Sequence, residues 1–387
     1  MSLRKIVLLI CSSMTVMAGA TISPALPLIG EYFKSTPDIE TYVRLVFTTP
    51  ALFIVLSGPL IGFLVDKFGR KPVLAISLIL YGISGSAGLY LDSMFSLLIS
   101  RAFLGTAVSG VLTCTTTLIA DYFSGTEREK FMGKQSAFMG LGGIVFLVAG
   151  GVLALISWRG PFAVYLLALA VFPTVLLWIT EPEHAKNTEQ HPDNSSGNIP
   201  WKSIYPLYLL AAVGMVLFNL IPVQLPFYLK EIANSTPPQI GIAIAWMTLC
   251  SAIASVLYSK IRQSLSFERI LAIMFFLIAI GFISLGMINT YPAALVTLIF
   301  CGLGFGLFMP NNNVMVTQRA PEFARGRVVG GLTTCLFLGQ FLSPLLAQPI
   351  ININGIGGIL GAYGVAAILA CVLAVGFLIS SFVNAKT

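Results

Sequence analysis

The stretch Gly62-Phe-Leu-Val-Asp66-Lys67-Phe-Gly69-Arg70-Lys71-Pro72 concentrates four charged residues and two glycines in a chain of which only 10% is charged. Two long apolar runs, residues 45–65 and 73–91, lie on either side of these charges. A turn this short and this cationic cannot lie in hydrocarbon, where its charges and open backbone groups would find no partners. The stretch therefore predicts a water-facing turn that joins two membrane spans.

The composition of the whole chain supports this interpretation. Of its 387 residues 57% are hydrophobic and 10% are charged, and the mean hydropathy is +0.91, whereas a soluble domain carries roughly 25% charged residues. The length accommodates about twelve spans of roughly 20 residues. We therefore predict an all-α integral membrane protein with helices at residues 6–29, 45–65, 73–91, 94–120, 132–156, 161–180, 204–229, 238–259, 269–289, 291–317, 328–350 and 358–383.

The positive charge of the chain has a topological interpretation. There are 22 Lys and Arg residues and a formal net charge of +7. If the N-terminus is cytoplasmic, most of these cations fall in cytoplasmic connections, as the positive-inside rule requires. We therefore expect a multi-pass protein of a bacterial-type inner membrane with both termini in the cytoplasm, and no binding of nucleic acid. The six cysteines lie in apolar runs without paired spacing, which predicts small core residues and no metal site.

The chain contains two related halves. Its longest polar stretch lies in residues 181–203, which we predict to be a cytoplasmic linker between one half at 1–180 and another at 204–387. A shift of 197 residues aligns five identical pairs across two spans and their connection. These pairs are Gly105 and Gly302, Arg128 and Arg325, Gly133 and Gly330, Leu141 and Leu338, and Gly142 and Gly339. Duplicated six-helix halves are typical of a transporter whose substrate site lies between them near the bilayer midplane.

Four motifs resemble those of the major facilitator superfamily, and within it those of the twelve-helix drug:proton antiporter branch. The turn at residues 62–71 is similar to the family's loop signature, with Lys67 where arginine is usual. Arg101-x3-Gly105, Ser23-Pro24-Ala-Leu-Pro27 and Trp158-Arg159-Gly-Pro-Phe162 resemble three further motifs. The resemblance implies two pseudo-symmetric six-helix halves and secondary active transport by alternating access, with the proton gradient as the energy source and no bound cofactor.

Three departures from the antiporter pattern stand against this resemblance. Phe146-Leu147 occupies the place of a Gly-Pro pair ahead of Gly150-Gly151, and the first span has no carboxylate in its interior. The second-half counterpart of the charged turn, residues 258–264, has lost both the acid and the glycine. We therefore expect only one well-formed turn of this kind.

We predict that the charged turn acts as a conformational latch. The resemblance implies that Asp66 faces residues 326–331 at the start of another span, where a carboxylate gains about 0.3–1 kcal/mol from the helix dipole when exposed. Arg70 can pair with Asp121 at the end of the span 94–120, and the two glycines permit close packing and a tight turn. The alternative is that the cations are ordinary positive-inside residues. The predicted latch residues are Gly62, Asp66, Gly69, Arg70 and Asp121.

Three further charges are candidates for proton coupling or for lining the cavity. Arg101 lies inside a span, where a lone guanidinium is costly, so we expect it to face the central cavity or a partner. Glu31 is the nearest carboxylate by topology and could carry the coupled proton under the influence of Arg101, with Arg44 nearby. The alternative is that Glu31 and Arg44 are interfacial residues that snorkel into water.

Polar and aromatic residues inside the spans are candidates for the substrate site, because amides in hydrocarbon must find partners and so tend to point inward. The run Pro310-Asn-Asn-Asn313 is the best of them, because proline frees backbone carbonyls that a cavity can use. Taken singly, each residue is as well explained as a contact between helices. The candidates are Gln135, Met139, Phe218, Asn219, Gln224, Tyr228, Trp246, Asn311, Asn312, Asn313, Phe337 and Gln340.

The sequence thus predicts a monomeric secondary transporter in the lipid bilayer that exports small amphipathic organic molecules or drugs in exchange for protons. An alternative of the same class is transport of an anionic metabolite, such as a carboxylate siderophore or an organic acid, because Arg44 and Arg101 without an interior acid would make the cavity positive. A membrane-embedded receptor is the alternative from a different class. The sequence shows no Ser/His/Asp, Cys/His or metal constellation, which disfavours an enzyme.

Overall fold

The chain folds into helices that are long and apolar enough to cross a membrane. A computed structural model describes residues 3–182, 199–353 and 358–384. Within these ranges there are twelve candidate spans and no β-strand. The prediction of an all-α protein with twelve spans is therefore confirmed, and each predicted span overlaps one observed span.

The first span is broken into three helical segments, whereas each of the next five spans consists of one α-helix or of one α-helix with a 3-10 segment. The first span runs through α1 (Leu3–Ala20), η1 (Ser23–Ala25) and α2 (Leu26–Tyr32). Pro24 and Pro27 lie in the first turns of η1 and α2, where a missing N–H costs little. The other elements of the first half are α3 (Ile39–Phe68), α4 (Arg70–Ser86) with η2 (Ala87–Leu89), α5 (Met94–Tyr122), α6 (Gly125–Ala154), and η3 (Gly160–Leu166) with α7 (Leu167–Trp178).

The second half also contains six spans. Its elements are α8 (Trp201–Ala233), α9 (Pro237–Ser264), α10 (Phe267–Leu285), α11 (Tyr291–Arg319), η5 (Glu322–Ala324), α12 (Arg325–Asn352) and α13 (Ile359–Asn384).

The chain divides into two compact units. Unit 1 comprises Met1–Asn194 with Thr236–Gly241, and unit 2 comprises Ser195–Ser235 with Ile242–Thr387. The predicted linker at 181–203 lies mostly outside the described residues, which resume at Ile199.

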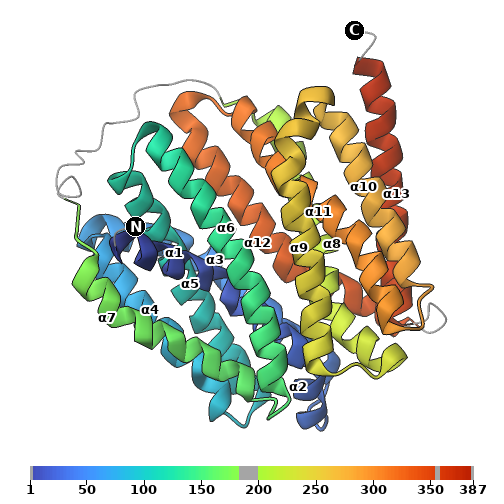
Figure 1. Cartoon of the computed structure of the whole chain (residues 1–387), viewed down its shortest axis with the longest axis horizontal. Helices are drawn as coiled ribbons and strands as arrows, with labels where there is room; N and C mark the ends of the chain where they lie inside the picture. Colours follow the sequence, from blue (N-terminus) through green and yellow to red (C-terminus); the bar gives the residue numbers. More distant parts are fainter. Residues whose placement is uncertain (1–2, 183–198, 354–357, 385–387) are drawn as a thin grey trace. The chain divides into compact units, whose positions relative to one another are not determined.

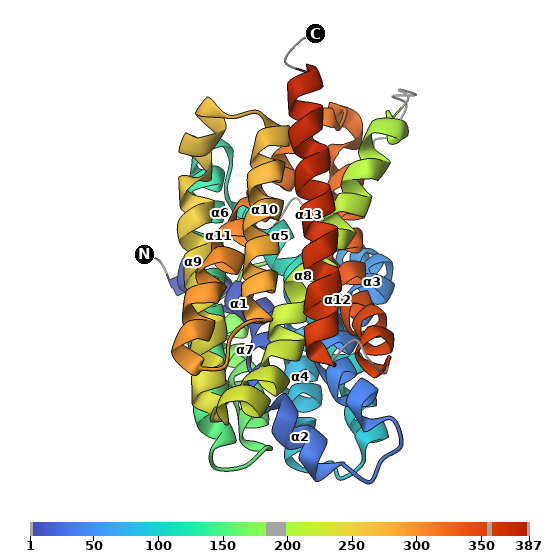
Figure 2. The ribbon, with the colours of Figure 1, turned by 90° about the vertical axis from the view of Figure 1, so that its right-hand side faces the viewer.

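Each unit is held together by extensive contacts between neighbouring helices. In unit 1, α3 and α4 both lie against α5, and α1 lies against α6 (Figure 1). In unit 2, α12 lies against α8, and Figure 2 shows α13 running alongside α10. Apolar side chains such as Ile368, Val372 and Ile379 remain exposed along α13. That exposure suits a helix whose solvent is lipid.

Glycines at equivalent positions in the two units allow close contacts between helices. A Cβ atom at Gly105 would lie 2.4 Å from the carbonyl oxygen of Pro50, and one at Gly302 would lie 2.6 Å from that of Met247. Pro50 and Met247 are also 197 residues apart. The shift found in the sequence therefore relates packing contacts as well as residue types.

The end of unit 1 where α4 meets α5 is held by the Trp158–Phe162 motif. The guanidinium of Arg159 lies 4.3 Å from the ring centre of Trp158 and 5.5 Å from that of Tyr32. It donates to two main-chain carbonyls of the α4–α5 connection, each at 2.9 Å, and pairs with Asp92. One side chain thus joins three connections of the unit.

Alanine at Gly105 or at Gly302 is expected to destabilise the protein, because the added Cβ would meet a main-chain oxygen that cannot move without shifting a helix. Overpacking of this kind typically costs about 1–3 kcal/mol. We expect the midpoint of thermal denaturation to fall by several degrees, measured on detergent-solubilised protein by fluorescence-detected size-exclusion chromatography.

Alanine at Gly133 or at Gly330 is the matched control, because a Cβ atom at either position would meet no atom within 4 Å. Alanine is favoured over glycine in a helix by about 0.8–1.0 kcal/mol, so the midpoint should stay unchanged or rise. Equal losses in all four variants would contradict the assignment of Gly105 and Gly302 to close helix contacts.

Candidate latch and buried polar sites

The turn between α3 and α4 consists of a single residue. α3 ends at Phe68 and α4 begins at Arg70. Gly69 between them has a φ of +91°, and its N–H donates to the carbonyl of Val65 at 3.0 Å. Residues with a side chain rarely adopt such a positive φ, so a turn this tight requires glycine.

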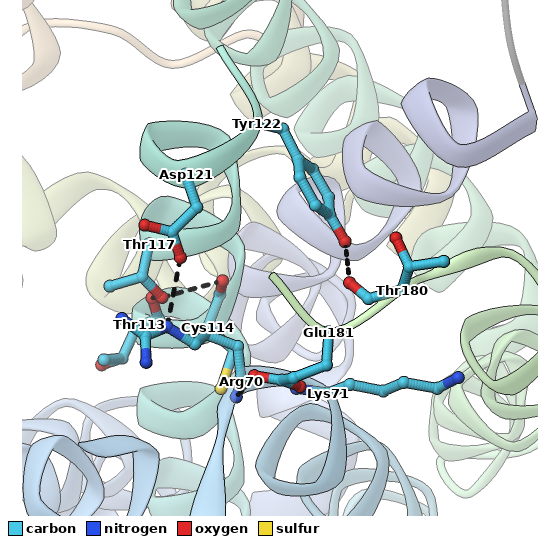
Figure 3. Close-up of polar contacts among 9 residues, drawn as sticks. All are labelled: Arg70, Lys71, Thr113, Cys114, Thr117, Asp121, Tyr122, Thr180 and Glu181. Carbon is cyan, nitrogen blue, oxygen red and sulfur yellow. Dashed lines mark hydrogen bonds and ion pairs between the residues drawn. The ribbon is translucent and has the colours of Figure 1, made fainter. Parts of the chain in front are cut away.

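Glu181 supplies the N-terminal cap that Gly69 cannot provide. The open amides of Arg70 and Lys71 donate to its two carboxylate oxygens, at 2.7 Å to Oε1 and 2.8 Å to Oε2 (Figure 3). One carboxylate therefore satisfies two N–H groups at the positive end of the dipole of α4. A cap of this kind is worth about 0.5–2 kcal/mol.

The predicted pair of Arg70 and Asp121 is present at the same place. Nε of Arg70 donates to Oδ2 of Asp121 at 3.1 Å, and the two side chains are 13% and 29% exposed. An ion pair open to water contributes about 0.2–1 kcal/mol, which is of the same order as the cap by Glu181. Lys71 adds a bond from Nζ to the carbonyl of Leu176 near the end of α7, at 2.9 Å.

The start of α1 lies against the same group of residues. The guanidinium of Arg4 lies 4.4 Å from the ring centre of Tyr122, whose hydroxyl donates to the carbonyl of Thr180 (Figure 3). Lys5 pairs with Glu127 at 2.9 Å. We call this end of unit 1, where α1 starts, α3 turns into α4 and α5 and α7 end, the latch end.

Two predicted latch residues, Asp66 and Gly62, make no latch contact within the described part of unit 1. Asp66 is exposed and forms no ion pair or hydrogen bond with the described residues of unit 1. Its predicted contact with residues 326–331 would join the two units and stays a prediction. A Cβ atom at Gly62 would meet no atom within 4 Å, so the close packing expected at that glycine is absent from this structure.

The corresponding turn of unit 2 is held in a different way. The counterpart of Arg70 is Phe267, so the ion pair cannot form there. The hydroxyl of Ser266 instead caps α10 from its own turn, accepting from the N–H of Arg269 at 3.3 Å. The guanidinium of Arg262 lies 3.8 Å from the ring centre of Phe267. Of these two turns, only that of unit 1 is tied by a carboxylate to a distant part of the chain, among the residues that the structure describes.

Arg101 is fully buried in unit 1 and contacts no carboxylate among the described residues. Its Nη2 donates to the carbonyls of Ser84 and Gly85 at 3.1 and 2.7 Å. Its guanidinium carbon lies 5.0 Å from the ring centre of Phe162 and 5.2 Å from that of Tyr165. Carbonyl dipoles and ring faces thus lie where an acid was expected, while Nε and Nη1 of Arg101 are buried without a hydrogen-bond partner among the described residues.

The expected pair of Glu31 and Arg101 is therefore wrong in this structure. Of the two surroundings expected for Arg101, the central cavity or a partner, the structure shows partners, which are carbonyls and rings. Glu31 is exposed in α2. Arg44 is only 4% exposed, and its Nη1 donates to the carbonyl of Glu40 one turn earlier in α3. Arg44 does not snorkel into water, because the protein covers it.

Most of the predicted substrate residues with assigned contacts hold helices together. Gln135 in α6 donates from Nε2 to the hydroxyl of Ser12 in α1 at 3.0 Å. Trp246 donates to a carbonyl of α11 at 3.1 Å, and Tyr228 to the last carbonyl of α10 at 2.7 Å. These contacts agree with the alternative that such residues are interhelical contacts, and leave fewer groups for a ligand.

Two adjacent amides of α11 differ in this respect. Oδ1 of Asn311 accepts a hydrogen bond from the hydroxyl of Tyr258 at 3.2 Å, which joins α9 to α11. Asn312 is 1% exposed, and neither polar atom of its amide has a hydrogen-bond partner among the described residues. A buried polar group without a partner costs about 1–3 kcal/mol. Asn312 is therefore the predicted substrate residue with most to gain from a ligand.

The other buried or half-buried candidates lie on α6, α8 and α12, and none of them stands out as a ligand contact as Asn312 does. Asn219 is buried and donates to a carbonyl of its own helix at 2.9 Å, and Gln224 is fully buried in the same helix. Met139, Phe337 and Gln340 are half-buried in α6 and α12. The part of the chain that the structure describes contains no cluster of three or more metal-binding side chains.

Sequence reasoning missed three residues that fasten unit 1. Glu181 fell in the predicted linker, although a glycine without a capping side chain ahead of α4 signals that a cap must come from elsewhere. Tyr81 and Tyr165 are buried, and their hydroxyls donate to carbonyls of α1 at 2.7 and 2.8 Å. A tyrosine inside an apolar span needs such an acceptor, and that is the signal that could have identified them.

The chain was compared with known proteins. The family model described as Major Facilitator Superfamily matches residues 8–232 and 207–386. The chain is 31% identical over 226 residues to the class B tetracycline resistance protein of Escherichia coli, covering 57% of this chain and about half (52%) of that relative. It is 24% identical over 350 residues to the quinolone resistance protein NorA of Staphylococcus aureus, covering 89% and 90%. The structure of the nucleoside transporter NupG superimposes with a TM-score of 0.80 at 13% identity, covering 97% and 99%.

Alanine in place of Glu181 is expected to free the first amides of α4, because no other side chain is seen to accept from them. We expect faster hydrogen–deuterium exchange in a peptide that covers residues 69–75, measured by mass spectrometry on the detergent-solubilised protein. Glutamine at the same position keeps one oxygen acceptor and should give an intermediate rate.

Glu127→Ala is the control, because Glu127 lies at the same end of unit 1 and pairs with Lys5 on the exposed surface. That variant should leave exchange in residues 69–75 unchanged. If Glu181→Ala also leaves it unchanged, the carboxylate does not cap α4.

Proposed function

The chain belongs to the Major Facilitator Superfamily, and we propose its function from that membership. It is a multi-pass membrane transporter and not an enzyme. We propose that it is a secondary active transporter that exports small amphipathic organic molecules in exchange for protons. The observation that carries this proposal is the similarity, along most of the chain, to proteins named for resistance to quinolones and to several drugs.

The latch end supports a cytoplasmic location for the N-terminus, and an even number of spans would then return the C-terminus to the same side. Arg4, Lys5, Lys67, Arg70 and Lys71 all lie at or next to this end of unit 1. Such a cluster of cations favours the cytoplasmic side of an inner membrane. We propose that both termini lie there and that the protein works as a monomer.

The two latch contacts support a role in alternating access. The Arg70–Asp121 pair joins the start of α4 to α5, and Glu181 joins it to the segment that follows α7. We therefore expect the turn to move with the rest of unit 1. Asp66 lies directly ahead of this fixed turn and is exposed. We propose that it meets the helix N-terminus at 326–331 when the cytoplasmic side closes, and that this contact favours the outward-open state.

The buried state of Arg101 argues against an anionic substrate. That alternative depended on a cavity made positive by Arg44 and Arg101. Both side chains are at most 4% exposed. Arg101 lies among carbonyls of α4 and aromatic rings, and its Nε and Nη1, which form no hydrogen bond with the described residues, are buried as well. Export of neutral or cationic amphipathic molecules therefore remains the stronger proposal, and Glu31, which is exposed, remains the proposed proton carrier.

Asn in place of Asp66 is expected to abolish transport while leaving expression intact, because the amide keeps the shape of the side chain and removes the charge that the helix dipole attracts. The assay uses everted membrane vesicles with an imposed pH gradient, reported by a quenched acridine dye. Tetracycline or a quinolone should restore fluorescence with the wild-type protein and not with Asp66→Asn.

Asp38→Asn is the control, because it makes the same chemical change at another exposed position. Asp38 has a φ of +53°, which asparagine tolerates well. This variant should transport as the wild type does. A normal response from Asp66→Asn would overturn the latch, and no response to either drug from the wild-type protein would overturn their export in exchange for protons.

Alanine in place of Asn312 is expected to weaken drug binding without loss of stability, because the amide it removes has no partner to lose. Asn311→Ala should instead lower the thermal midpoint, because it breaks the bond from Tyr258. A thermal-shift titration with tetracycline and a quinolone measures both effects. If Asn312→Ala leaves drug stabilisation unchanged and lowers the midpoint, Asn312 is structural.

A further inference from the structure

An apolar groove lies between α3 and α4 on the surface of unit 1, next to the latch end. Its volume is about 360 Å³. It is lined by Leu60, Ile61, Leu64 and Phe68 of α3, by Pro72, Val73, Ile76, Ser77 and Leu80 of α4, and by Thr106 of α5. The groove arises because α3 and α4 both pack on α5 and diverge from each other beyond the one-residue turn at Gly69.

The groove offers nothing to a polar ligand. Its two hydroxyl groups both bond within their own helices: Ser77 donates to the carbonyl of Val73 at 2.7 Å and Thr106 to that of Ala102 at 3.3 Å. The other lining residues are apolar. Since the groove lies between two membrane spans, its occupant must be apolar, and the acyl chains of the surrounding bilayer are the apolar groups in greatest supply there.

A cation stands at the end of the groove. Lys67 precedes the lining residue Phe68, and its side chain is exposed. Its Nζ lies 5.3 Å from the ring centre of Phe68 and 5.8 Å from that of Phe63, and it forms no ion pair with the described residues. The neighbouring cations are engaged, because Arg70 pairs with Asp121 and Lys71 donates to a carbonyl of α7.

We propose that the groove between α3 and α4, together with the ammonium of Lys67, is a binding site for an anionic phospholipid. One acyl chain lies between the two helices, and the phosphate at the headgroup level pairs with Lys67. The proposal rests on a membrane location alone and does not depend on the substrate or on proton coupling. A lipid held there touches Phe68 and Pro72 on both sides of the latch turn, so its headgroup lies beside Asp66.

The second unit provides a natural comparison for the test. The residue 197 positions after Lys67 is Ser264, and the one after Ile76 is Ile273, which is also exposed. A tryptophan at Ile76 would fill the groove, whereas one at Ile273 lies on the equivalent face of α10. Neither position is in the core, since the two isoleucines are 66% and 40% exposed.

The experiment is native mass spectrometry of the full chain in detergent, titrated with equal amounts of phosphatidylglycerol and phosphatidylcholine. We expect the wild-type protein to prefer phosphatidylglycerol for its first bound lipid. Lys67→Gln should reduce that preference about fivefold, which is the value of about 1 kcal/mol expected for one cation near a lipid surface. Ile76→Trp should reduce binding of both lipids.

Lys260→Gln and Ile273→Trp are the controls, because Lys260 is an exposed lysine close to the end of α9 and Ile273 is the repeat counterpart of Ile76. Both should bind lipid as the wild type does. Equal binding of the two lipids by the wild-type protein would overturn the proposal. So would unchanged binding in Lys67→Gln and Ile76→Trp, or a loss of the same size in the controls, because ordinary boundary lipid would then explain the signal.

Discussion

Hydrocarbon offers no hydrogen bonds, and this constraint determines most of what the structure shows. Every described span is helical because only a helix satisfies its own backbone. The polar side chains inside the spans follow the same requirement: the hydroxyls of Tyr81 and Tyr165 bond to carbonyls of α1, and Arg101 bonds to carbonyls of α4. Polar groups that reasoning from sequence assigns to a ligand are thus largely consumed in joining helices.

The two units differ in how the helix after the equivalent turn is capped. At a water-facing turn, water can satisfy the first amides of a helix, so a capping side chain is not required there and can differ between the two units. Unit 2 caps α10 with the adjacent Ser266, which ties the turn to nothing else. Unit 1 caps α4 with Glu181, 111 residues away, and this ties the turn to the segment that follows α7. A movement of Glu181 would therefore break or shift its hydrogen bonds to the first amides of α4.

The fold could be predicted from the sequence almost completely, because span length, charge distribution and the repeat are all properties of single segments. The candidate site could be predicted only in part. The pair of Arg70 and Asp121 followed from a family motif and is present. Glu181 was missed because Gly69 signals only that α4 lacks a local cap, and a main-chain partner does not indicate which distant side chain provides one. For Arg101 the depth was predicted correctly, but its partners are carbonyls and aromatic rings instead of an acid. Charge alone therefore did not identify the partner.

Asn311 and Asn312 show how far the sequence can separate binding from structure. Both are amides in the same turn of α11, both are buried, and both follow Pro310. Only the geometry of a neighbouring helix distinguishes them, because Tyr258 reaches Asn311 and leaves Asn312 without a partner. Retaining a buried amide at a cost of about 1–3 kcal/mol is unexplained by stability. The cost is accounted for if the amide acquires its partner in another state of the transport cycle, and a ligand that enters the bundle is such a partner.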